Sequence, residues 1–169
     1  YIRYAFENGI GKVYGYEPDP YLFKILQKNV KKLNRVSVYR CAIVDSIFES
    51  DMIEFFVPKG KGKAWSSILS TKGRNCFKVP CKKIVDVFED HKDITLVKVD
   101  IEGAEYDLLD YIIEKGLQTK FDNIQIQFHI IADYEKRREK IRKELSKTHH
   151  LTFDFPVGLH ENWKLNKNI

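Results

Sequence analysis

A continuous apolar run followed at once by a segment with helical periodicity, in residues 93–116, most constrains the fold of this chain. The run DITLVKVD is rich in β-branched residues, as in a strand that a parallel sheet buries on both faces. In the next segment, AEYDLLDYIIEKG, four apolar residues share one helical face and Gly116 suits the position after a helix. These four residues are Leu108, Leu109, Ile112 and Ile113. The stretch therefore predicts a strand, a turn and a helix.

The same order recurs along the chain. KVYGYEP (12–18) predicts a strand, and the helix after it has Asp19 as a candidate N-cap and Pro20 at its first position. Further strands are expected at RVSVYRCAIVD (35–45) and IQIQFHII (124–131), with a helix at 134–148. This alternation predicts an α/β fold with a Rossmann-like, doubly wound, mostly parallel sheet. MIEFFVP (52–58) and CFKVPCKKI (76–84) predict two strands that pair as an antiparallel insertion.

Length and composition narrow the class of protein. The 169 residues predict one domain, 1–169, and the chain starts at Tyr1, so we expect its native N-terminus to lie upstream. The sequence has no run of about 18 apolar residues, so no membrane span is predicted. Three cysteines without C-x-x-C spacing indicate a reducing compartment, which predicts a cytoplasmic location. The net charge of +5 is dispersed, and the basic residues of 134–147 alternate with glutamates, which argues against nucleic-acid binding.

Acidic residues follow two of the expected strands. In doubly wound sheets, ligands bind at the carboxyl ends of strands, so these acids are candidate site residues. Glu17 can accept the hydroxyls of a ribose or can serve as a helix-start charge. Asp100 and Glu102 are two residues apart and point to one side if the strand continues through them. Gly103 allows a sharp turn, and Glu105 is read chiefly as a charge at the start of the next helix.

Several other residues have both a structural and a functional interpretation. His129, near the end of an apolar strand, is a packing residue or a base in the same crevice. Trp65, Ser66 and Ser67 lie in the Gly- and Lys-rich stretch 59–74, which is a surface loop or a substrate lid. Trp163 is expected to be a packing residue.

Two segments together resemble FkbM-type S-adenosylmethionine-dependent methyltransferases. VYGYEPDPYLFKILQKNV (13–30) is similar to the family's E-P-x-P segment, and LVKVDIEGAEYDLL (96–109) to its D-x-E-G-A-E segment. RCAIVDSIFESDMIEFFVP, SSIL and IQIQFH fit the same family along most of the chain. The resemblance implies a class I fold that transfers a methyl group from S-adenosylmethionine to a hydroxyl of a sugar, lipid or small metabolite.

The resemblance also implies roles for individual residues. Glu17, with Pro18 beside it, would bind the cofactor ribose, and the segment 41–45, which includes Cys41 and Ala42, would lie near the adenine. Asp100 and Glu102 would border the methionine end and the acceptor, with Asp100 touching both cofactor and acceptor. Asp100, Glu102 or His129 would be the base that takes the acceptor proton. A magnesium ion on Asp100 and Glu102 is a further possibility, but we predict no metal site.

The sequence departs from the family in two places. The family's glycine motif D-x-G-A-x-x-G, expected before a helix at 1–8, is absent from the sequence. Gln127 stands where the family often has Glu. Two other classes remain open. One is a NAD-dependent oxidoreductase of Rossmann type. An acid after the second strand of a nucleotide-binding sheet, the place that Glu17 would take, suits NAD as well as S-adenosylmethionine. The other is a non-catalytic binding domain of the methyltransferase type.

Overall fold

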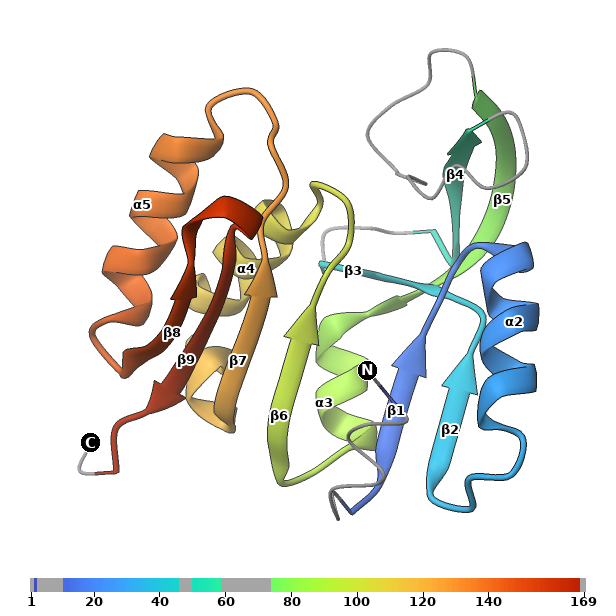
Figure 1. Cartoon of the computed structure of the whole chain (residues 1–169), viewed down its shortest axis with the longest axis horizontal. Coiled ribbons are helices and arrows are strands. Elements are labelled where there is room, and N and C mark those ends of the chain that lie inside the picture. The colour runs from blue at the N-terminus through green and yellow to red at the C-terminus, as the bar shows by residue number, and fades with distance from the viewer. Residues whose placement is uncertain (1, 3–10, 46–49, 59–73, 168–169) are drawn as a thin grey trace. The chain divides into compact units, whose positions relative to one another are not determined.

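A computed structural model describes residue 2 and residues 11–45, 50–58 and 74–167. The chain divides into two compact units, residues 1–84 and 85–169 (Figure 1). The first unit contains β1 (Val13–Tyr16), α2 (Pro20–Val30), β2 (Val36–Tyr39), β3 (Ala42–Val44), β4 (Met52–Pro58) and β5 (Arg74–Lys83). The helix α3 (Ile84–Asp90) leads into the second unit, which contains β6 (Ile94–Val99), α4 (Glu105–Glu114), β7 (Phe121–Gln127), α5 (Tyr134–Leu145), β8 (His149–Phe155) and β9 (His160–Leu165). Short 3-10 helices lie at Leu117–Lys120 and Pro156–Gly158.

The first unit begins with the predicted strand, turn and helix. β1 and β2 pair in parallel, from Val13 opposite Val36 to Tyr16 opposite Tyr39. Between them, α2 starts at Pro20, and Asp19 is its N-cap as predicted. The Asp19 carboxylate accepts hydrogen bonds from the backbone N–H groups of Tyr21 (2.7 Å) and Leu22 (3.0 Å). This satisfies amide groups that the first helical turn leaves without partners.

The rest of the first unit is a small mixed sheet. β5 lies between β3, which is parallel to it, and β4, which is antiparallel to it. The predicted antiparallel pairing of the two inserted strands is confirmed. The buried core of this small mixed sheet consists of Ala42, Val44, Ile53, Phe55 and Val79.

The second unit is a sheet in the order β6-β7-β9-β8. β6 and β7 are parallel, whereas β9 is antiparallel to both β7 and β8. Figure 1 shows α4 behind β7 and β9. The fully buried side chains of its core include Tyr106, Leu109, Ile112, Phe121, Ile124, Ile126, Ile141 and Leu145. Parallel pairing of β6 and β7 places the carboxyl ends of both strands at one edge of the sheet.

The mixed α/β class is confirmed. The single strand expected at 35–45 is two strands, β2 and β3, which belong to different sheets, and β9 is an additional strand. β9 was not predicted, because HENWKL buries Glu161 and Trp163 on one face and so lacks the apolar alternation of an ordinary strand. Trp163 is a packing residue, as expected. The strands form separate sheets of two, three and four members, so one doubly wound sheet in one domain stays a prediction.

Some predictions fall where the structure gives little or no information. Trp65, Ser66 and Ser67 lie outside the described residues. Of the helix expected at 1–8, only Ile2 is described, and it is helical. Within the described part of the chain, no helix is both long and apolar enough to span a membrane.

Candidate functional site

The turn between β6 and α4 carries the predicted acids. β6 ends at Val99, so the strand does not continue through Asp100 and Glu102 as the alternation argument required. Instead, Glu102 has a φ of 56° and Gly103 a φ of 103°. A left-handed conformation costs a non-glycine residue about 1–2 kcal/mol. The chain thus reverses at a strained glutamate, and this turn, rather than strand alternation, sets the direction of the carboxylates.

His129 lies at the same edge of the sheet, because it follows β7, the parallel neighbour of β6. Its Nε2 atom is 3.4 Å from Glu102 Oε2 and 4.0 Å from Asp100 Oδ1. All three side chains are partly exposed, with 22% of His129, 32% of Glu102 and 36% of Asp100 accessible. The structure therefore brings together the three candidate catalytic residues at a position that a ligand can reach.

Glu105 holds His129 from the inside of the unit. Its side chain is fully buried, and its Oε1 atom accepts a hydrogen bond from the backbone N–H of His129 (2.6 Å). The same oxygen lies 3.0 Å from Nδ1 of the imidazole. Oε2 accepts a hydrogen bond from the backbone N–H of Gly103 (2.8 Å). Glu105 does begin α4, as expected, but its contact with His129 was missed, since nothing local in the sequence links residues 24 positions apart.

Tyr106 fixes the other side of the His129 backbone. Its hydroxyl donates a hydrogen bond to the carbonyl oxygen of His129 (2.8 Å), and its ring packs 5.3 Å from that of Phe128. Burial raises the pKa of Tyr106, so the hydroxyl stays a donor. His129 is therefore held at its N–H, its carbonyl and its ring. Sequence reasoning missed Tyr106 as well, because a buried aromatic on a helix is ordinarily only a core residue.

The negative charges of this cluster favour the protonated, positively charged form of His129. The hydrogen bond to Glu105 raises the pKa of His129 against the opposing effect of burial, and the negative charges of Glu105, Glu102 and Asp100 raise it further. Lys98 forms an ion pair with Asp100. Among residues 11–45, 50–58 and 74–167, no group of three His, Cys, Asp or Glu side chains is arranged to hold a metal ion.

The predicted ribose-binding residue belongs to the first unit. Glu17 follows β1, and its backbone N–H donates to Tyr39 at the end of β2 (3.1 Å). Its Oε1 atom accepts a hydrogen bond from the N–H of Asp19 (2.8 Å), so the carboxylate is held beside the start of α2. Pro18 is half-buried next to it. Glu17 thus occupies the carboxyl end of a parallel strand pair, as predicted.

Cys41 and Ala42, the residues predicted near the adenine, are buried in the first unit. Ala42 belongs to the apolar core of the small mixed sheet. Burial raises the pKa of the Cys41 thiol, which therefore stays protonated near neutral pH. With both side chains buried, we expect any ligand contact here to come from the backbone.

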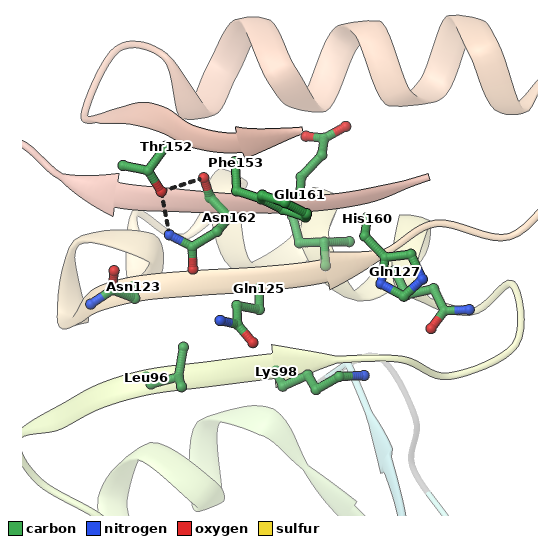
Figure 2. A pocket seen from close by; sticks show the side chains of 11 residues that line it. Leu96, Lys98, Asn123, Gln125, Gln127, Thr152, Phe153, His160, Glu161 and Asn162 are labelled. Atoms are coloured by element: carbon green, nitrogen blue, oxygen red, sulfur yellow. Dashed lines mark hydrogen bonds between the residues drawn. The ribbon is translucent and has the colours of Figure 1, made fainter. Parts of the chain in front are cut away.

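A groove of about 420 Å³, lined by both polar and apolar side chains, lies on the sheet of the second unit (Figure 2). β7 contributes Asn123, Gln125 and Gln127, since alternate residues of a strand share a face. The other residues along it are Leu96, Lys98, Ile126, Thr152, Phe153, His160, Glu161 and Asn162. The groove was not predicted, although the alternation in IQIQ was a signal for a polar face. Gln127 therefore borders this groove, at the position where a Glu was expected.

The family of the chain is shown by its similarity to a family model. A family model described as the methyltransferase FkbM domain matches residues 1–155. A search of curated proteins found no match, and neither did a search of solved structures. The family match includes β1 with Glu17, the turn with Asp100 and Glu102, and β7 with His129. It covers most of the 169 residues, and the chain therefore belongs to the FkbM methyltransferase family.

Proposed function

We propose that this protein transfers a methyl group from S-adenosylmethionine to a hydroxyl of a sugar, a lipid or a small metabolite. The observation that carries the proposal is the cluster of Asp100, Glu102 and His129 at the ends of β6 and β7, in a chain of a methyltransferase family. Carboxylates there favour a cationic ligand, and the imidazole offers a proton acceptor.

Side chains of each unit, taken separately, suit a part of this cofactor. Glu17 has a carboxylate held in place by the N–H of Asp19, and a carboxylate is a suitable acceptor for ribose hydroxyls. Asp100 and Glu102 bring negative charge that suits a sulfonium. When bound, S-adenosylmethionine supplies an activated methyl group. The protein's own task is then to position the acceptor hydroxyl in line with that methyl and to take up its proton.

Isothermal titration calorimetry with S-adenosylmethionine, S-adenosylhomocysteine and NAD tests the cofactor class. We expect the first two to bind and NAD not to bind. Tight binding of NAD alone would instead favour an oxidoreductase, because an acid after a strand serves both cofactors. Binding of none of the three would support a non-catalytic domain.

The role of Glu17 has its own test. We expect Glu17→Ala to weaken S-adenosylmethionine binding by about 1.5–3 kcal/mol, the value of hydrogen bonds to a charged group. Glu54→Ala is the matched control, since Glu54 is an exposed glutamate of β4 in the same unit. Equal affinities of the two variants would remove Glu17 from the cofactor site.

The reaction itself is tested with methyl-labelled S-adenosylmethionine and a panel of sugars, glycolipids and hydroxylated metabolites. For an acceptor found in this way, we expect Asp100→Asn to lower turnover more than cofactor affinity. The reason is that Asp100 lies 4.0 Å from the Nε2 atom of His129, a candidate proton acceptor, whereas Glu17 is the residue proposed for the ribose. Wild-type turnover in Asp100→Asn would assign the residue no part in the reaction.

A further inference from the structure

The hydrogen bonds of Glu105 determine which nitrogen of His129 carries a proton. Both carboxylate oxygens of Glu105 accept backbone N–H groups, at 2.6 Å from His129 and 2.8 Å from Gly103. N–H donors at both oxygens favour the ionised carboxylate, which is the form that only accepts hydrogen bonds. The Nδ1 atom, 3.0 Å from Oε1, must then be the donor in that contact. Nδ1 therefore carries the proton in the neutral imidazole, and Nε2 has the lone pair.

Two features allow Glu105 to remain charged although it is fully buried. Two backbone N–H groups and an imidazole N–H solvate its oxygens in place of water. In addition, Glu105 is the first residue of α4, where the helix dipole favours negative charge. The carboxylate can thus keep its charge and counter a proton gained by His129.

Of the two ring nitrogens of His129, Nε2 is the one that faces the partly exposed carboxylates of Asp100 and Glu102. It lies 3.4 Å from Glu102 and 4.0 Å from Asp100, and 22% of the His129 side chain is accessible. Carboxylates ordinarily titrate near pH 4 and are weaker bases than imidazole. Asp100 is in addition engaged in an ion pair with Lys98. A histidine with a buried carboxylate behind it is therefore the strongest proton acceptor of the cluster.

We infer that His129 Nε2 accepts the proton of the acceptor hydroxyl and that Glu105 is the positioning residue that presents this atom. The inference rests on the proposed function. In the transfer, the hydroxyl oxygen forms a bond to the methyl carbon while the carbon–sulfur bond breaks and leaves its electron pair on sulfur. The hydroxyl proton moves to Nε2, and the resulting imidazolium lies between Glu105 and the pair Asp100 and Glu102. Its proton then passes to solvent.

The test is nitrogen NMR of the histidine side chains in the full chain, with His129 assigned by comparison with His129→Gln. In the unsubstituted protein above the titration midpoint of His129, we expect the hydrogen on Nδ1. A predominant hydrogen on Nε2 would overturn the inference, and this measurement needs no change at Glu105.

The variant Glu105→Gln tests the carboxylate. Its amide oxygen keeps the shape and can still accept a hydrogen bond, but the negative charge is lost. We expect the titration midpoint of His129 to move to lower pH, while the signals of the other four histidines act as internal references. An unchanged midpoint would also overturn the inference.

Tyr106→Phe is the matched control. It removes a hydrogen bond to the His129 backbone but leaves the contact between the His129 imidazole and Glu105 in place. We expect the tautomer and the midpoint of His129 to stay as in the unsubstituted protein. A shift equal to that of Glu105→Gln would mean that loosening of the segment, and not the carboxylate, controls the imidazole. These readouts contain no cofactor, so they fail or succeed separately from the calorimetric test of the proposed function.

Discussion

Two buried glutamates of the second unit, Glu105 and Glu161, have opposite surroundings. Both side chains have 0% accessible surface. Glu161 on β9 is neutralised by Arg138 and Arg142 of α5, whose Nε atoms lie 2.6 and 2.8 Å from its Oε1. Glu105 accepts hydrogen bonds from backbone N–H groups and from an imidazole, and no lysine or arginine pairs with it among the described residues.

The network of ion pairs and hydrogen bonds around Glu161 has a structural role. The indole N–H of Trp163 donates to Glu161 Oε2 (2.7 Å), and Asp154 pairs with both arginines. Arginine keeps its charge at every pH that a folded protein meets, so this network does not change protonation near neutral pH. It fixes α5 on the antiparallel strands.

The pair Glu105 and His129 differs because its cation can lose its proton. An imidazole is the ordinary group that changes charge between pH 5 and 8. One buried carboxylate thus holds a permanent charge pair together, whereas the other supports a group that can exchange a proton with a ligand. The difference lies in the partner and not in the glutamate.

The largest expected effect on stability is that of Glu161→Gln. It leaves two arginines, which are only 14% and 32% exposed, with Asp154 as their remaining counter-charge. Removing one partner of a buried ion pair costs about 3–5 kcal/mol, and the partial exposure of Arg142 places the expected loss near 3 kcal/mol. Urea unfolding followed by circular dichroism measures it. Glu114→Gln is the control, because its pair with Lys115 is exposed and we expect no measurable change in the free energy of unfolding.

The same measurement on Glu105→Gln sharpens the comparison. The amide can still accept from the backbone N–H groups, and no permanent cation is left unpaired, so we expect a loss of about 1 kcal/mol, the value of a typical hydrogen bond. A loss as large as that of Glu161→Gln would show that Glu105 is equally structural.

Relief of strain at the turn should have an effect of the same size and the opposite sign. Glu102 has a φ of 56°, whereas glycine adopts this conformation without a steric cost. We expect Glu102→Gly to raise the free energy of unfolding by about 1 kcal/mol. Glu102→Gln removes the charge but keeps the strain, so it should not show this gain. Equal stabilities of the two variants would contradict a strained turn.

The smallest expected effect is a dependence of stability on pH. The pKa of His129 is higher in the folded protein than its ordinary value of 6.5, chiefly because of the hydrogen bond to Glu105. The stabilisation from this pair is therefore complete below pH 6.5 and is lost as the pH rises through the folded pKa. Unfolding curves across this range should show the loss, and Glu105→Gln should reduce it. An identical pH dependence in the two proteins would contradict the role of Glu105.

Local patterns predicted the parts of this fold that depend on neighbouring residues. Asp19 was identified as the N-cap from the order of Asp, Pro and an apolar face, because capping involves only the first helical turn. The antiparallel pairing of β4 and β5 followed from two β-rich runs. By contrast, β9 was missed because its buried Glu161 is paired with Arg138 and Arg142 of α5, which are distant in the sequence.

Some features of the candidate site were likewise predicted from the sequence, and others were found only in the tertiary structure. The sequence by itself determined that acids stand after two strands, that His129 follows a third, and that the chain resembles the FkbM methyltransferases. These are properties of residue type and short spacing. Only the tertiary structure decided that Glu105 and Tyr106 hold His129 and that the left-handed turn at Glu102 directs the carboxylates toward its Nε2 atom. The contacts of His129 with Glu105 and Tyr106 join residues 24 and 23 positions apart, and parallel pairing of β6 and β7 brings them together.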